Sequence, residues 1–231
     1  GEASKGDEFS SFLVPYLFLM ILFMTVFMSG QLLLRSVMEE RTSRTIEILL
    51  CSVTPDELMK GKILGLGALG TVQMLFYLIL GLLATKYKSW AMIEYTQIPF
   101  FLIYFLTGYL FYAAIFAAMG TFFTSEQEAQ QSSGFISIIA VLPIAFASYF
   151  ITNPGSSFTI ASSYFPPLTP FMMIIRLGTE SVEGNEIFLT TVLMIFSCWF
   201  LLKIAGKIFR TAILLYGKKI TVREVVTWMQ N

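Results

Sequence analysis

The chain has 231 residues, of which 56% are hydrophobic, 16% aromatic and only 13% charged, and its mean hydropathy is +0.74. A soluble domain carries about 25% charged residues, so this composition favours a membrane protein. The sequence contains no histidine, which excludes Ser-His and Cys-His nucleophile pairs, His-ligated metals and histidine proton relays. Basic and acidic residues balance at 15 each, so we expect no nucleic-acid partner.

Five apolar runs are long enough to cross a bilayer as helices, which takes about 20 mainly apolar residues. In chain order they are 12–34, 63–84, 98–123, 132–151 and 187–204. A further apolar stretch, 165–177, is short and contains Pro166, Pro167 and Pro170, which predicts a re-entrant or interfacial helix. The sequence therefore predicts an all-α polytopic membrane protein with five transmembrane helices.

These runs divide the chain into three predicted parts. Residues 1–10 are polar and are expected to form an extracytoplasmic stub, 11–205 the transmembrane domain and 206–231 a cytoplasmic tail. Within the transmembrane domain, the loop 35–62 joins the first two spans, and the external segment 152–177 contains the short apolar stretch. Basic and apolar residues alternate in the tail, which favours anchoring at lipid headgroups, with a subunit contact as the alternative.

The lysines and arginines predict the orientation, because cytoplasmic loops are enriched in them. Eleven lie on one side, in the loops 35–62 and 124–131 and in the tail from Lys203. The other side holds four, which are Lys5, Lys86, Lys88 and Arg176. We therefore expect a multi-pass plasma-membrane protein whose N-terminus is outside and whose C-terminus is cytoplasmic. An external N-terminus needs a signal peptide or an earlier span, so we expect the chain to be a fragment.

The interiors of the five runs contain no Asp or Glu, and Glu186 only borders the last run. Ion-coupled transporters usually place such groups within their spans, so a self-powered ion pump is poorly supported. Gln73 is the best candidate for lining a pathway, with an interhelical hydrogen bond as the alternative, and Arg176 is expected to snorkel or to line a mouth. No nucleotide-binding P-loop is present, so we expect no cofactor on this chain.

The loop between the first two spans predicts two consecutive helices. Charges alternate from Glu39 to Glu47 and apolar residues recur at helical spacing, which predicts a short amphipathic helix. Thr54, Pro55 and Glu57 then form a capping box with proline at the first helical position, which predicts a helix that continues into the second span. The pattern alone leaves open a passive surface helix or a partner-docking element.

A glycine motif follows at once. Gly61 and Gly65 make a G-x-x-x-G, and Gly67 and Gly70 come next. Such small residues let two helices approach closely, and a packed small-residue face can also slide during gating. We therefore expect Gly61 and Gly65 to pack against another helix.

The string from Glu39 to Leu50, continued by 52–55 and 61–65, resembles the hallmark loop of ABC-2 type permeases and is closest to the sodium-efflux (NatB-like) branch. The resemblance implies the permease subunit of an ATP-driven exporter. Its 39–53 segment would be a coupling helix that docks on a separate ATP-binding subunit, which binds ATP and magnesium. The docking residues that the resemblance implies are Glu39, Glu40, Arg41, Arg44, Glu47, Leu50 and Pro55.

Two further stretches are similar to the same family. Residues 124–131 resemble its second cytoplasmic loop, with Glu126 and Glu128 as contacts, and 167–176 resemble its external helix pair. The resemblance implies an external gate, for which the candidate residues, together with Gln73, are Phe165, Pro167 and Arg176; an aromatic interfacial anchor is the alternative. It also implies pairing with a second permease copy in the bilayer, and a missing first span and extracytoplasmic domain, so the chain is expected to be a C-terminal membrane portion.

Two other functions stay open. A non-transporting membrane scaffold would hold a soluble partner through the same loop. A passive channel is weakened by the absence of a charged ring or filter-like sequence. Sodium, a hydrophobic drug and a lipid are all candidate substrates.

Overall fold

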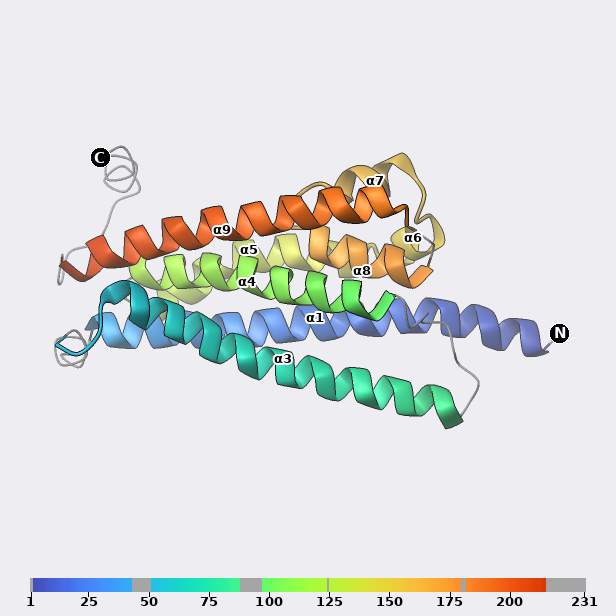
Figure 1. Cartoon of the computed structure of the whole chain (residues 1–231), viewed down its shortest axis with the longest axis horizontal. Helices are drawn as coiled ribbons and strands as arrows, with labels where there is room; N and C mark the ends of the chain where they lie inside the picture. Colours follow the sequence, from blue (N-terminus) through green and yellow to red (C-terminus); the bar gives the residue numbers. More distant parts are fainter. Residues whose placement is uncertain (1, 43–50, 88–96, 124, 180–181, 215–231) are drawn as a thin grey trace.

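The computed structural model in Figure 1 describes residues 2–42, 51–87, 97–123, 125–179 and 182–214. Over these ranges the chain forms eight helices and no strand, which confirms the predicted all-α class. The helices are α1 (Glu2–Thr42), α3 (Pro55–Tyr87), α4 (Ile98–Phe122), α5 (Glu126–Ala145), α6 (Ala147–Thr152), α7 (Ser157–Ser163), α8 (Thr169–Thr179) and α9 (Gly184–Leu214).

The long helices run side by side along the molecule, and α4 lies at the centre of the bundle (Figure 1). It contacts α1, α3, α5, α8 and α9. Its sequence suits this position, because aromatic residues alternate with alanine and glycine over much of its length and most of the helix is buried. The short helices α6, α7 and α8 gather at the end of the bundle where α9 begins (Figure 1).

Three helices of the described chain are long and apolar enough to cross a membrane. They are Phe12–Glu39 within α1, Ile98–Phe122 and Gly184–Arg210. The predicted runs 63–84 and 132–151 fall in α3 and in α5 with α6, respectively. Five membrane spans therefore remain a prediction, of which three are matched by length and composition.

Several predicted boundaries change in the structure. Residues 2–10, expected as a stub before the first span, are the first turns of α1, and residues 206–214 of the expected tail continue α9. The single helix expected over 132–151 is wrong: α5 and α6 meet at Phe146, three residues after Pro143. Proline removes a backbone N–H and crowds the preceding turn, so a helix breaks or bends near it.

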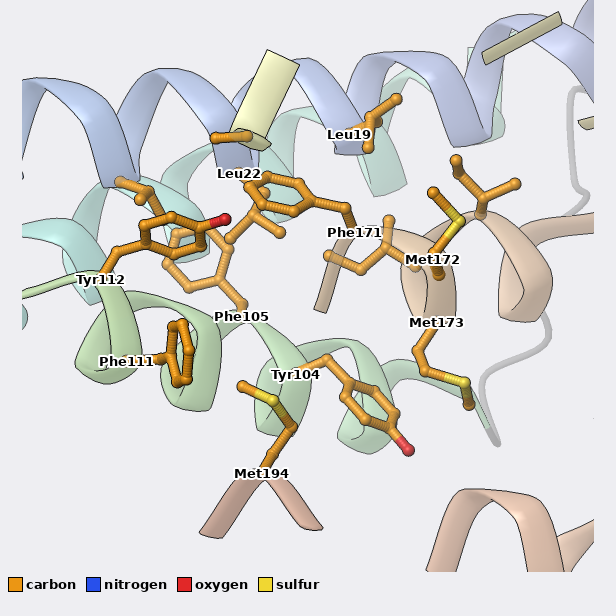
Figure 2. Packing of buried hydrophobic residues seen from close by; sticks show 14 of the residues in the cluster. Leu19, Leu22, Tyr104, Phe105, Phe111, Tyr112, Phe171, Met172, Met173 and Met194 are labelled. Carbon is orange, nitrogen blue, oxygen red and sulfur yellow. The ribbon is translucent and has the colours of Figure 1, made fainter. Parts of the chain in front are cut away.

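The largest buried cluster joins α1, α4 and α8, and Figure 2 shows its centre. Phe171 of α8 points between Leu22 of α1 and Tyr112 of α4 (Figure 2), and the Phe171 and Tyr112 rings pack edge to face with centroids 5.8 Å apart. Close packing of aromatic rings adds to the dispersion energy of the core. The cluster therefore holds the short helix α8 inside the bundle.

Glycines permit close helix approaches in the bundle, at Gly67 and Gly70 of the predicted glycine motif but not at its first two positions. A Cβ atom at Gly67 of α3 would lie 2.8 Å from the Tyr109 ring, and one at Gly108 of α4 would lie 2.7 Å from Pro170. In the described part of the chain, a Cβ at Gly61 or Gly65 would meet nothing within 4 Å. This pair therefore does not pack against a described helix of the same chain, and its packing against a helix of another subunit stays a prediction.

Candidate functional site

The two ends of the bundle differ in character. At the first, which we call the basic end, α1 and α4 finish, α3 and α5 begin, and α9 finishes (Figure 1). Its described basic residues are Arg35, Arg41, Lys60, Lys62, Lys203, Lys207 and Arg210. The opposite end, which we call the α8 end, contains α6, α7, α8 and the first turn of α9 (Figure 1). The helix ends that flank the loops 35–62 and 124–131 thus share one end, as the charge pattern predicts.

At the basic end, Lys62 connects α3 to α1. Its ammonium group donates hydrogen bonds to the main-chain oxygen of Ser36 at 2.9 Å and to the Ser36 hydroxyl at 2.6 Å. Hydrogen bonds from a charged donor are stronger than neutral ones, more so where water is partly excluded. These contacts hold together the two helices that flank the predicted coupling segment.

The predicted capping box is confirmed. The Thr54 main-chain N–H donates to Glu57 Oε2 at 2.9 Å, the Thr54 hydroxyl donates to the same oxygen at 2.8 Å, and the Glu57 N–H donates to the hydroxyl at 3.3 Å. The N–H and hydroxyl of Thr54 lower the pKa of the Glu57 carboxyl below its ordinary value, because both favour the charged form. The reciprocal bonds define the start of α3.

An apolar cluster lies directly beneath this helix start. Met59 and Ile63 of α3 are buried with Leu33 and Val37 of α1 and with Phe209 of α9. The cluster also includes Tyr109 and two alanines of α4. Because close-packed cores deform little, a displacement of the first turns of α3 would be passed to α1, α4 and α9.

The predicted docking residues are only partly described. Glu39, Glu40 and Arg41 belong to the last turns of α1, where the Glu39 side chain is exposed, and Pro55 is the first residue of α3. Residues 51–53 form a turn. Arg44, Glu47 and Leu50, and with them most of the predicted coupling helix, lie outside the described residues.

The second predicted contact begins α5 at the same end. Glu126 is the first residue of this helix, and Glu128 is exposed in its first turn. The Ser125 hydroxyl accepts a hydrogen bond from the Glu128 N–H at 3.3 Å and thereby caps the helix. The contact of these glutamates with another subunit stays a prediction.

At the α8 end, Arg176 forms an ion pair. Its side chain is 5% exposed, and its Nη2 atom lies 2.6 Å from Oε2 of Glu186, whose side chain is 22% exposed. In the described chain the guanidinium is buried and paired rather than extended to solvent, and the expectation that Arg176 lines a mouth stays a prediction. An arginine within an apolar segment needs an acidic partner. Glu186 is a nearby acidic residue in the sequence, so this rule could have predicted the ion pair.

Polar contacts next to this pair join α9 to α4. The Tyr104 hydroxyl lies 2.6 Å from the Thr190 hydroxyl and 3.1 Å from the main-chain oxygen of Ile187, and it accepts a hydrogen bond from Thr191 at 3.2 Å. Buried hydroxyls need partners of this kind. A tyrosine and two threonines in apolar runs give little sequence signal, and we did not predict this cluster.

The other candidate gate residues take different positions. The Pro167 main-chain oxygen accepts a hydrogen bond from the buried Tyr112 hydroxyl at 2.7 Å, whereas the Phe165 side chain is exposed. Gln73 is half-buried on α3, which lies on the other side of α1 from α8 (Figure 1). The structure thus groups Pro167 and Arg176 near α8 and leaves Gln73 apart from them.

Comparisons with known proteins agree with this architecture. The sequence matches the family described as ABC-2 family transporter protein over residues 2–207. It is 31% identical over 227 residues to the uncharacterized protein MJ1024 of Methanocaldococcus jannaschii, covering 97% of this chain and 56% of that protein. It is 24% identical over 229 residues to the uncharacterized protein YhaP of Bacillus subtilis, covering 91% of this chain and 53% of that protein.

The chain thus spans about half the length of these curated relatives. No solved structure matches the sequence. The family match covers all the described helices except the last turns of α9. On this match, the chain belongs to the ABC-2 family of transporter proteins.

Proposed function

We propose that this chain is the membrane part of a permease subunit of an ABC-2 type exporter. A separate ATP-binding subunit docks on the 39–53 segment and on the first turn of α5, and its ATP-driven movement is transmitted through α1 and α3. The basic end faces the cytoplasm, because its lysines and arginines follow the distribution found in cytoplasmic loops. A second permease copy completes the transporter, with the pathway between the two copies.

The observation that carries the proposal is the anchoring of the docking segment on both sides. Lys62 holds the last turns of α1 to α3, and Thr54 and Glu57 begin α3 only four residues after Leu50. Met59 and Ile63 then pack against three other helices. A force applied to the segment therefore reaches the whole basic end rather than a single helix.

Co-purification with an ATP-binding subunit tests the proposal. The full-length protein is expressed with a candidate ATP-binding subunit, purified through a tag on the permease and assayed for ATP hydrolysis in proteoliposomes. We expect about one ATP-binding subunit per chain, and we expect Glu39→Lys and Arg44→Glu to weaken the complex and lower its ATP turnover. Glu183→Lys, an equal charge reversal at the exposed start of α9, serves as the matched control.

The outcomes separate exporter from scaffold. A stable complex with ATP turnover that falls in both docking variants, and not in Glu183→Lys, supports the exporter. A soluble partner without ATPase activity that is lost in the same variants indicates a membrane scaffold instead. Binding that is unchanged in both variants contradicts the assigned docking segment.

The substrate is the finer part of the proposal. The resemblance of the 39–65 segment to the sodium-efflux branch makes sodium the first substrate to test, although the interiors of the predicted spans lack carboxylates that would hold a tightly bound ion. Hydrophobic drugs and lipids are the other two. The stimulation of ATP turnover by sodium, by a hydrophobic drug and by a lipid, measured in the purified complex, ranks these three candidate substrates.

A further inference from the structure

The last described helix, α9, lies along one side of the bundle (Figure 1). One of its faces packs mainly on α4 and α3, and the buried side chains of this face include Met194 and Cys198. The opposite face carries large apolar side chains, among them Val192, Phe196 and Trp199, whose exposed fractions are 47%, 61% and 52%. Nothing in the described part of the chain covers this face, so in a membrane it borders lipid or another protein chain.

Basic residues continue the same face toward the basic end. Residues three or four positions apart lie on one face of a helix, and six exposed residues of α9 follow this spacing without a gap. We call them the exposed stripe: Val192, Phe196, Trp199, Lys203, Lys207 and Arg210. From residue 187 to the end of α9 there is no Asp or Glu, so no acidic side chain of the same segment neutralises the three cations. The stripe is therefore apolar in its first half and positively charged in its second half.

The stripe changes from apolar to basic where α9 leaves the hydrocarbon. The Lys203 ammonium lies 4.1 Å from the centre of the Trp199 ring, and tryptophan and lysine are typical of a membrane interface. From Lys203 back to Glu186 the helix rises about 26 Å, close to the hydrocarbon thickness of about 30 Å. From Lys203 to Arg210 it rises about 10 Å, which is enough to cross the headgroup layer of one leaflet. The three cations therefore lie at the depth of lipid phosphates.

The chemistry of the stripe fits a phospholipid with a net negative charge. The rings of Phe196 and Trp199 offer an apolar surface to acyl chains. A guanidinium group such as that of Arg210 binds two phosphate oxygens at once, and the Lys203 ammonium adds a point charge nearer the hydrocarbon. A zwitterionic headgroup also carries a phosphate, but its own ammonium group is repelled by the cations of the protein. An anionic headgroup has no such opposing charge, so the stripe favours it.

A second copy of the chain fits this face less well. Two copies related by a two-fold axis along the membrane normal place the same residues at the same depth. If their exposed stripes met, Lys203 and Arg210 of one copy would face the same cations of the other, and like charges repel. A soluble subunit can reach the basic residues but not the apolar residues within the hydrocarbon. Lipid is therefore the occupant that matches both halves of the stripe.

We propose that the exposed stripe binds an anionic phospholipid. Its phosphate lies against Lys203 and Arg210, with Lys207 beside them, and its acyl chains lie along Phe196 and Trp199. The proposed orientation of the chain makes this a lipid of the cytoplasmic leaflet. The choice of leaflet is the one point that rests on the proposed function, because the binding itself needs no ATP-binding subunit.

The test uses Trp199 as a reporter of the neighbouring lipid. In the full-length protein every other tryptophan is replaced by phenylalanine, and the protein is reconstituted in phosphatidylcholine vesicles that contain a fixed fraction of phosphatidylglycerol. Two preparations have the same lipid composition, but the brominated acyl chains, which quench tryptophan fluorescence on contact, belong to phosphatidylglycerol in one and to an equal amount of phosphatidylcholine in the other. We expect stronger quenching by brominated phosphatidylglycerol, with a preference of about fivefold or more, because one basic residue near an anionic surface changes binding by about this factor.

Charge-removing variants test whether the stripe is the source of the preference. Lys203→Gln with Arg210→Gln is expected to abolish it, so that the two brominated lipids quench Trp199 equally. The matched control, Arg35→Gln with Lys60→Gln, removes two exposed basic residues from α1 and α3 at the same end of the bundle and is expected to keep the preference. The exchange Lys203→Arg with Arg210→Lys keeps both charges and is also expected to keep it.

Vesicles of brominated phosphatidylcholine alone separate a lost site from a lost fold. If they quench Trp199 equally in the parent and in Lys203→Gln with Arg210→Gln, the helix still borders lipid at the same depth, and a lost preference supports the site. Equal quenching by both brominated lipids in the parent overturns the proposal. An equal loss of preference in the Arg35 and Lys60 control also overturns it, because the net charge of the protein would then attract the lipid.

Two further outcomes concern other partners. A Trp199 that neither brominated lipid quenches is covered by another protein chain, which overturns the proposal. Failure of the chain to bind an ATP-binding subunit contradicts the exporter assignment and leaves the lipid measurement unaffected, because that measurement uses the permease alone.

Discussion

Lys62 of α3 donates to both the main-chain oxygen and the hydroxyl of Ser36 of α1. We expect Lys62→Met to lower the free energy of unfolding by about 1–2 kcal/mol, because two hydrogen bonds from a charged donor are lost at a half-buried site. In the complex with the ATP-binding subunit, the variant should also lower substrate-stimulated ATP turnover. Lys60→Met, at an exposed position of α3 two residues before Lys62, should leave both unchanged. If Lys62→Met and Lys60→Met had equal effects, the role of Lys62 in connecting α3 to α1 would be contradicted.

The capping box at Thr54 gives a second prediction. Thr54→Ala should weaken the start of α3 by about 1 kcal/mol, because the hydroxyl caps the Glu57 N–H. Hydrogen exchange of the amides of the first turn, followed by mass spectrometry, measures the change. Lys60→Ala, an equally exposed position inside the same helix, serves as the control and should exchange as the parent does.

The same box predicts a pH dependence. The pKa of Glu57 is lowered in the folded chain, chiefly by the Thr54 N–H, so its contribution to stability is present above the pKa of the unfolded chain and is lost as the pH falls through the folded value. The protection of the first-turn amides of α3, measured relative to their intrinsic exchange rate at each pH, should therefore fall in acid. Glu57→Gln keeps the reciprocal hydrogen bonds but not the charge. In this variant the protection of the first-turn amides of α3 should depend less on pH. An unchanged acid response in this variant would show that another group is responsible.

Two glycines of α3 form a matched pair for substitution. Gly67→Leu should destabilise the fold by several kcal/mol, because its Cβ would lie 2.8 Å from the Tyr109 ring and overpacking of a core typically costs about 1–3 kcal/mol or more. Gly65→Leu meets no described neighbour within 4 Å and should leave thermal stability in detergent unchanged. A Gly65→Leu protein that is folded but altered in its oligomeric state would place this face against another chain.

A hydrogen bond between α1 and α5 allows a further comparison. Gln31 donates to the Ser133 hydroxyl at 3.0 Å, and interhelical bonds of this type contribute about 0.6–2 kcal/mol. Gln31→Leu should lower the melting temperature of the purified protein accordingly. If Gln73 lines a pathway, Gln73→Leu should instead alter substrate-stimulated ATP turnover with little change in melting temperature. If Gln73→Leu instead lowered the melting temperature and left ATP turnover unchanged, Gln73 would have the structural role.

Local signals predicted the parts of the fold that depend on local chemistry. Helix-length apolar runs located the long helices, and the spacing of Thr54, Pro55 and Glu57 predicted the start of α3 to the residue. The break at Phe146 was missed because an apolar run shows no change of composition there, although Pro143 was visible. The sequence did not distinguish Gly67 and Gly70, which lie close to neighbouring helices, from Gly61 and Gly65, which do not, since the side of α3 that meets α1 and α4 depends on tertiary packing.

Only the part of the candidate site whose residues lie in one segment of the sequence could be predicted. The docking residues that the resemblance implies lie close together in the sequence, so one family-like string predicts them together, and their role stays a prediction. The cluster at the α8 end joins Tyr104, Arg176 and Glu186 from three helices, and such pairings depend on how the helices pack. A rule that every arginine in an apolar segment needs an acidic partner would have recovered one of these contacts.

Pro15 gives α1 a preferred point of bending. The helix is continuous over 41 residues, but proline removes one of its backbone hydrogen bonds. A Cβ at Gly178, near the end of α8, would lie 2.9 Å from the Pro15 ring. The end of α8 therefore lies in close contact with α1 at Pro15. Any side chain at position 178 would therefore have to displace Pro15 or the end of α8, so the approach of these two helices depends on the side chain that glycine lacks.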